Sequence, residues 1–223
     1  MCGASLIAPR FLASAFHCFY HSEYPNINFD RDCSLPGRCF ATIRQHHLAL
    51  KDIGEQRIDI RSVHQPPFEG GDLAIVDLKE PVSLDERAQL VKVSAERLVK
   101  GDLVLTLGWG LAFQRGRPNV LLKAQLTVSE VDRTGDLTFT EVGDNNGIPV
   151  DPCRGDSGGP LLAKKDGVGE WLLYATLQGG GYNCQTNKTA GDGAWNSLAP
   201  HADWVQEILN IPGENQFCIL HEN

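Results

Sequence analysis

Residues 151–160 are Asp-Pro-Cys-Arg-Gly-Asp-Ser-Gly-Gly-Pro, and this stretch determines how the rest of the chain is interpreted. Ser157 is a candidate nucleophile, because glycines on both sides let backbone N–H groups approach a developing oxyanion without a Cβ atom in the way. Asp156 adds a negative charge that must be paired or solvated once it is buried. The stretch therefore has the composition of a nucleophile loop.

A nucleophilic serine needs a general base and a carboxylate that orients the base. The stretch Cys2-Gly-Ala-Ser-Leu-Ile-Ala-Pro-Arg-Phe-Leu-Ala-Ser-Ala-Phe-His-Cys18 offers His17. The stretch Asp72-Leu-Ala-Ile-Val-Asp-Leu78 offers a carboxylate, and Gly108-Trp-Gly110 follows it. The chain order is therefore His, Asp, Ser.

These segments closely resemble those of the chymotrypsin-like (S1) serine proteases, in the trypsin-like subgroup. The resemblance runs from Cys2 to the last predicted helix. It implies a secreted endopeptidase in which His17 is the general base, Asp72 orients it and Ser157 attacks the substrate. The N–H groups of Gly155 and Ser157 would then form the oxyanion hole.

Two of these residues have other interpretations. A lone histidine is usually a satisfied core residue and can be a metal ligand, but within this constellation we favour the base. Asp72 could be an aspartate that starts a strand after Gly70-Gly71, and Asp77 is a second carboxylate nearby. The match to the family falls on Asp72.

Substrate preference is expected to come from Asp151, six residues before the nucleophile. In the trypsin-like proteases this position lies at the base of the pocket, where it pairs with a substrate Arg or Lys. Gly180 and Gly193 match the pocket walls, where glycine leaves room for a long side chain. The alternative for Asp151 is that it caps a turn within Pro149-Val-Asp-Pro152.

Short β-like segments separated by Gly, Pro, Asn and Asp predict an all-β protein. The family resemblance specifies two six-stranded antiparallel β-barrels with a C-terminal helix, with the first strand missing from the chain. The helix is predicted at Ala202 to Asn210, with Trp204, Val205, Ile208 and Leu209 on one face. The predicted strands cover 5–7, 39–50, 56–64, 72–78, 103–108, 121–131, 137–142 and 171–177.

Composition excludes several classes of partner. The chain has 223 residues, a net charge of −8 and no run of Lys or Arg, so nucleic acid is not an expected partner. Charged residues interrupt every apolar stretch before it could span a bilayer, so no membrane association is expected. The expected partners are protein or peptide substrates and protease inhibitors, with no cofactor. Carboxylates around Asp52 are too poorly spaced for calcium, so no metal is predicted.

Seven cysteines in a chain of ordinary composition indicate an oxidising compartment and hence secretion. Zinc is the rival interpretation, but no Cys-x-x-Cys pair or zinc-finger histidine spacing is present. The family resemblance implies the pairs Cys2–Cys18 and Cys153–Cys184, which leaves Cys33 and Cys39 to close a local loop. Cys218 is either a free thiol or linked to a missing upstream segment.

The expected domain organisation is a single trypsin-like domain over 1–223, truncated at its N-terminus, that ends in a tail at 213–223. Family members begin with a cleaved N-terminus whose ammonium pairs with the residue equivalent to Asp156. We therefore expect the chain as given to keep its nucleophile loop inactive or to pair Asp156 with another cation, and a processed longer form to be active. The rival interpretation is a catalytically impaired homologue that acts as a binding or regulatory module. The missing first strand and the unusual Gln178-Gly179 favour it.

Overall fold

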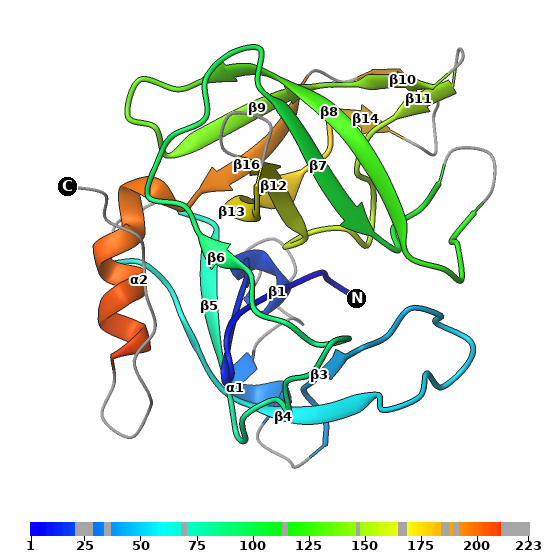
Figure 1. The fold of residues 1–223 in the computed structure, drawn as a ribbon, viewed down its shortest axis with the longest axis vertical. Coiled ribbons are helices and arrows are strands. Elements are labelled where there is room, and N and C mark those ends of the chain that lie inside the picture. The colour runs from blue at the N-terminus through cyan, green and yellow to red at the C-terminus, as the bar shows by residue number, and fades with distance from the viewer. Residues whose placement is uncertain are drawn as a thin grey trace.

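The chain forms two β-sheet units and a C-terminal helix, as described by a computed structural model (Figure 1). The structure describes residues 1–20, 29–33, 37–67, 71–112, 116–145, 148–164, 169–183, 188–189 and 192–210. The strands are β1 (Ser5–Ala8), β2 (Phe11–Ala15), β3 (Phe40–Ile43), β4 (Gln56–His64), β5 (Leu73–Leu78), β6 (Lys92–Val93), β7 (Leu103–Gly108), β8 (Leu122–Val131), β9 (Leu137–Glu141), β10 (Gly143–Asn145), β11 (Ile148–Val150), β12 (Pro160–Lys164), β13 (Trp171–Gly179), β14 (Tyr182–Asn183), β15 (Lys188–Thr189) and β16 (Gly193–Ser197). The helical segments are η1 (Phe16–Cys18), α1 (Phe29–Asp32), η3 (Ala199–His201) and α2 (Ala202–Leu209).

The N-terminal unit is an antiparallel sheet in the order β1-β2-β5-β4-β3. The predicted barrel has six strands, whereas this sheet has five among the described residues, with β1 and β3 at its edges. The described part of this unit is therefore a half-barrel.

The C-terminal unit is a closed barrel. Its strands follow the order β12-β7-β8-β9-β16-β13, and an antiparallel pairing of β12 with β13 closes the ring. β6 adds a short parallel pairing outside it, on β13. The prediction of an all-β chymotrypsin-like fold is confirmed.

The predicted strand at 39–50 is too long, because β3 ends at Ile43. Arg44 has a positive φ of 66°, a left-handed conformation that interrupts a strand. Beyond it the Asp52 carboxylate accepts the backbone N–H groups of His46 and His47, at 2.6 and 2.9 Å. These local bonds form a loop in place of the second half of the predicted strand.

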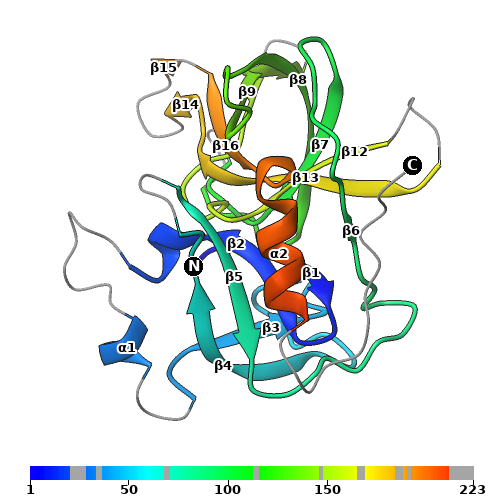
Figure 2. The same cartoon turned by 90° about the vertical axis from the view of Figure 1, so that its left-hand side faces the viewer.

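Three clusters of buried side chains hold the fold together. One fills the closed barrel around Trp195, and another lines the N-terminal sheet around Val76. The third joins both units to α2, whose Val205 and Leu209 are buried among residues of β1, β2, β5 and β13. Figure 2 shows α2 lying across the two units. The predicted apolar face of this helix is confirmed, since Trp204 and Ile208 also pack against this cluster.

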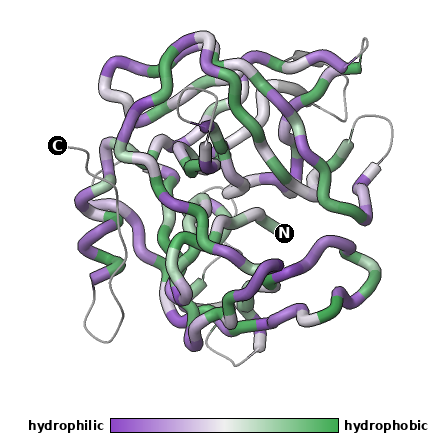
Figure 3. The backbone as a smooth tube through the Cα atoms, in the orientation of Figure 1, coloured by the Kyte–Doolittle hydropathy of each residue, from purple (hydrophilic) through white to green (hydrophobic). Residues whose placement is uncertain are grey.

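Figure 3 shows polar and apolar stretches interspersed along the chain. Burial alternates along β9, as expected of a strand with one face in the core, whereas β2 and β5 are buried at every position. None of the helices in the described ranges is long and apolar enough to cross a membrane.

Candidate active site

Strand pairing brings His17 to Asp72. β2 runs antiparallel to β5, and the register pairs Ala15, two residues before His17, with Leu73, the residue after Asp72. The turn η1 then carries His17 back over Asp72, whose carbonyl oxygen accepts the N–H of Phe16 at 2.7 Å. His17 and Asp72 each lie within two residues of the end of a paired strand, so the strand pairing positions both residues without a long loop.

The Asp72 carboxylate contacts His17 twice. Oδ1 accepts the backbone N–H of His17 at 2.7 Å, and Oδ2 lies 2.7 Å from His17 Nδ1. Because a carboxylate only accepts, Nδ1 carries the proton, and Nε2 of a neutral ring becomes the acceptor. The Asp72 side chain is 14% exposed and that of His17 30%, so the ring keeps access to solvent and to a substrate.

Asp77, the second candidate carboxylate, does a different job. Its Oδ1 accepts from Arg10 Nε at 2.8 Å, and its side chain is 7% exposed. Asp77 of β5 therefore pairs with Arg10, which lies in the turn between β1 and β2, and is not the partner of His17.

The main chain of Ser157 lies beside Cys18, the residue that follows His17. The Ser157 carbonyl oxygen accepts the N–H of Gly3 at 2.7 Å and lies 3.8 Å from Cys18 Sγ. Since Cys18 follows His17 directly, the nucleophile loop and the histidine turn meet at this point. Within the described part of the chain the Ser157 hydroxyl forms no hydrogen bond, and such bonds often tighten only when a substrate is present.

Glycines give the nucleophile loop its shape. Gly155 has φ +103° and Gly158 has φ +77°, values that favour residues without a Cβ atom. The N–H of Gly158 donates to Leu177 of β13 at 2.8 Å. Among the described residues, the N–H groups of Gly155 and Ser157 have no acceptor, as an oxyanion hole requires.

Asp156 points into the Gly108-Trp-Gly110 segment. Its oxygens accept the N–H groups of Gly110 and Cys153, at 2.6 and 2.9 Å, and a Cβ atom at Gly108 or Gly110 would overlap its carboxylate. Burial raises the pKa of Asp156, while these two hydrogen bonds and the charge of Arg117 act in the opposite direction. Among the described residues no cation forms an ion pair with Asp156, and two backbone N–H groups hold its carboxylate directly.

The three predicted pocket residues also come together. A Cβ atom at Gly180 would lie 3.0 Å from Asp151 Oδ2, and one at Gly193 would lie 3.5 Å from Asp151 Oδ1. A Cβ atom at Gly180 would also overlap the Pro152 carbonyl oxygen, so a larger residue there would require the backbone to shift, whereas one at Gly193 would make ordinary contact with Asp151. The Asp151 carboxylate thus lies next to both glycines.

Sequence reasoning missed two residues behind this pocket. Thr140 of β9 pairs in register with Gly193, and its hydroxyl accepts the indole N–H of the fully buried Trp195 at 2.9 Å. Trp195 was identifiable, because residues two apart on a strand share a face and Gly193 was already assigned to the pocket. Thr140 had no such signal, since only the pairing of β9 with β16 brings it there.

Comparison with known proteins agrees with this geometry. The family model described as Trypsin matches residues 1–205. The chain belongs to the trypsin family.

Individual relatives in this family are distant. Mannan-binding lectin serine protease 1 of Mus musculus is 25% identical over 229 residues, which cover 94% of this chain and 32% of the relative. Kallikrein-11 of Homo sapiens is 27% identical, covering 94% of this chain and 72% of the relative. Trypsin-1 of Astacus astacus is 24% identical, covering 92% and 86%. The chain thus spans about a third of the length of the first of these relatives.

The disulfides of this trypsin-family chain support the predicted pairing. Cys2 is bonded to Cys18, and Cys33 is bonded to Cys39. Cys153 is also disulfide-bonded, but its predicted partner Cys184 lies outside the described residues. Cys218 and the tail 213–223 lie outside them as well.

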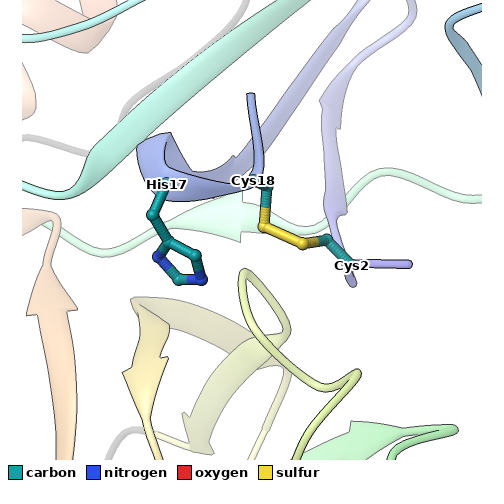
Figure 4. Close-up of side chains that lie close together, drawn as sticks. All are labelled: Cys2, His17 and Cys18. Carbon is teal, nitrogen blue, oxygen red and sulfur yellow. A yellow bond between two sulfur atoms is a disulfide. The ribbon is translucent and has the colours of Figure 1, made fainter. Parts of the chain in front are cut away.

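One cluster near the site has the residue types of a metal centre. The ligand atoms of Cys2, His17 and Cys18 lie within 4.8 Å of one another. Figure 4 shows that the two sulfur atoms are joined to each other beside the His17 ring. Because metals in proteins bind the thiolate, a cystine cannot supply these two ligands, and we interpret the cluster as structural.

Proposed function

We propose that this chain is a serine endopeptidase whose nucleophile is Ser157. The observation that carries the proposal is the double contact of Asp72 with the backbone and ring of His17, whose neighbour Cys18 lies 3.8 Å from the Ser157 carbonyl oxygen. This arrangement, with Nε2 as the acceptor, is what base catalysis by histidine requires. Because the chain spans only part of some relatives, the activity is proposed for this domain.

The proposed reaction has two halves. His17 Nε2 takes the hydroxyl proton of Ser157 as Oγ attacks the substrate carbonyl carbon, and the N–H groups of Gly155 and Ser157 bind the oxyanion. His17 then protonates the leaving amine, the C–N bond breaks and an acyl-enzyme remains. Water, deprotonated by His17, attacks the acyl group and releases the acid, which restores the Ser157 hydroxyl.

Labelling with a fluorophosphonate probe tests this proposal. The probe reacts with a serine only where a base activates it, so we expect one label per molecule, mapped to Ser157 by mass spectrometry. Denatured protein is the control and should remain unlabelled. Folded protein that takes up no probe would contradict the proposal and support the rival, a binding or regulatory module.

We further propose that the enzyme cleaves after Arg or Lys. The carboxylate of Asp151 beside Gly180 and Gly193 supports this, because a long cationic side chain fits such a pocket and pairs with its charge. A neutral substrate side chain would desolvate the carboxylate without supplying an opposite charge.

Replacing Asp151 with asparagine should lower kcat/KM for an Arg substrate by about 30- to 1,000-fold, the usual loss when one partner of a buried charge pair is removed. The measurement compares peptide coumarin amides that end in Arg and in Gln. The exposed Asp203 of α2 provides the control Asp203→Asn, which should keep the Arg preference. Equal losses on both substrates in Asp151→Asn would argue against the assignment.

Secretion is proposed on the basis of the disulfides, which persist in oxidising compartments. Its substrates would be proteins or peptides, and protease inhibitors that occupy the same cleft would be natural partners.

A further inference from the structure

Backbone hydrogen bonds between the segments 46–48 and 119–121 link the two β units near the nucleophile loop. The N–H of Leu48 donates to the carbonyl of Asn119 at 2.7 Å, and the N–H of Leu121 donates to that of His46 at 3.0 Å. The Trp109 indole N–H donates to the same His46 carbonyl at 3.1 Å. The segment that enters β8 is therefore fastened to the opposite unit by backbone hydrogen bonds.

Arg117, two residues before Asn119, lies over the nucleophile loop. A Cβ atom at Gly155 would be 3.1 Å from Arg117 Nη2, and Arg117 Nη1 lies 3.9 Å from Met1 Sδ. The guanidinium thus occupies the space between the oxyanion donors and the segment that enters the Cys2–Cys18 disulfide. The hydrogen bonds of Leu48 and Leu121 hold the backbone near Arg117 in place.

Arg154 adds a second cation to the same loop. It directly precedes Gly155, and both arginines are exposed. Within the described residues, neither arginine forms an ion pair with a carboxylate. Asp156 feels the charge of Arg117, but its own oxygens accept the N–H groups of Gly110 and Cys153. Both guanidinium groups therefore retain donors for a ligand.

The layout of the site indicates which part of a substrate they would meet. The residue before the scissile bond enters the pocket of Asp151 and Gly180, and the carbonyl meets the N–H of Gly155. The chain after the scissile bond would leave the oxyanion hole past Gly155. The Arg117 guanidinium lies against Gly155 and beside Met1, and Arg154 directly precedes Gly155, so both cations are close to the point where that part of a substrate would pass.

We propose that Arg117 and Arg154 form a subsite for an acidic side chain in the first two positions after the scissile bond. This inference rests on the proposed peptidase function and narrows its substrate class. A chain with a net charge of −8 repels acidic peptide segments in general. Two cations beside the oxyanion hole would offset that repulsion for an acidic residue just after the scissile bond.

Internally quenched peptides test the subsite. Each peptide has Arg before the scissile bond and Glu, Gln or Lys at the first or the second position after it. We expect kcat/KM for Glu to exceed that for Gln by about three- to tenfold, as for two exposed charge pairs, and the ratio to shrink as salt is added. Equal rates for Glu and Gln at both positions would overturn the proposal.

Charge reversal separates recognition from a structural role. The double variant R117E/R154E should prefer Lys over Glu at the same position, whereas loss of structure would lower all rates together. The control is R133Q, which removes an exposed arginine from the turn at 132–136 and should keep the Glu preference. A double variant that still prefers Glu would refute the subsite. If no peptide is cut and no fluorophosphonate label appears, the peptidase function itself fails, and the subsite fails with it.

Discussion

Replacing Ser157 with alanine should lower kcat for peptide hydrolysis by about 10⁴- to 10⁶-fold, because no other group in the site can form the acyl-enzyme. The residual rate would come from the oxyanion donors at Gly155 and Ser157 and from substrate positioning. The measurement is steady-state hydrolysis of an Arg coumarin amide at saturating substrate. Because Ser157 is partly exposed and its hydroxyl makes no hydrogen bond with the described residues, the variant should remain folded.

A control serine is available on the surface. The exposed Ser83 makes hydrogen bonds only through its backbone, with Gln56 and Arg44. Ser83→Ala should therefore keep full kcat and full labelling by fluorophosphonate. If Ser157→Ala retained more than about one hundredth of the rate, a different nucleophile would be at work, and the interpretation of the 151–160 loop would be wrong.

The catalytic segments could be found from sequence because their residue types match their local backbone. Gly155 and Gly158 have positive φ, so the loop needs glycine at these positions whatever surrounds it. His17 and Asp72 each lie within two residues of a strand, and the pairing of Ala15 with Leu73 is enough to bring them together. The apolar face of α2 followed from its helical period in the same way.

Strand ends and pairings between distant segments were harder to predict. The predicted strand at 39–50 ends early, because Arg44 is left-handed and the Asp52 carboxylate accepts the N–H groups of His46 and His47. β12 and β16 were not predicted, and each pairs with a strand far away in the sequence, β12 with β7 and β16 with β9. Gly193-Ala-Trp-Asn-Ser197 has no alternation strong enough to identify a strand alone.

The position of Arg117 is a further example. Nothing in the local sequence connects it with Gly155, which lies 38 residues later in the printed chain. Only the cross-unit bonds of Leu48, Asn119 and Leu121 bring its guanidinium to the oxyanion loop. Composition gave the opposite impression, since a net charge of −8 suggests an acidic surface throughout.

Replacing Asp72 with asparagine should lower kcat by about 10⁴-fold while leaving the shape of the site intact. The asparagine oxygen can still accept the backbone N–H of His17, but its NH₂ group would face Nδ1 and donate to it. The ring would then carry its proton on Nε2, the atom that must accept the hydroxyl proton of Ser157. Steady-state kinetics measures the loss, and ¹⁵N NMR of the imidazole reports the change of tautomer directly.

Asp77→Asn is the matched comparison, because Asp77 lies on the same strand and was the other candidate carboxylate. The substitution removes the ion pair between Asp77 Oδ1 and Arg10 Nε, which are 2.8 Å apart and poorly exposed to solvent, so thermal stability should fall. Titration with the fluorophosphonate counts the folded molecules, and kcat per labelled site should match that of the unmodified chain. The assignment of Asp72 requires both results, because a tautomer change in the Asp77 variant, or a normal kcat in the Asp72 variant, would place the orienting carboxylate elsewhere.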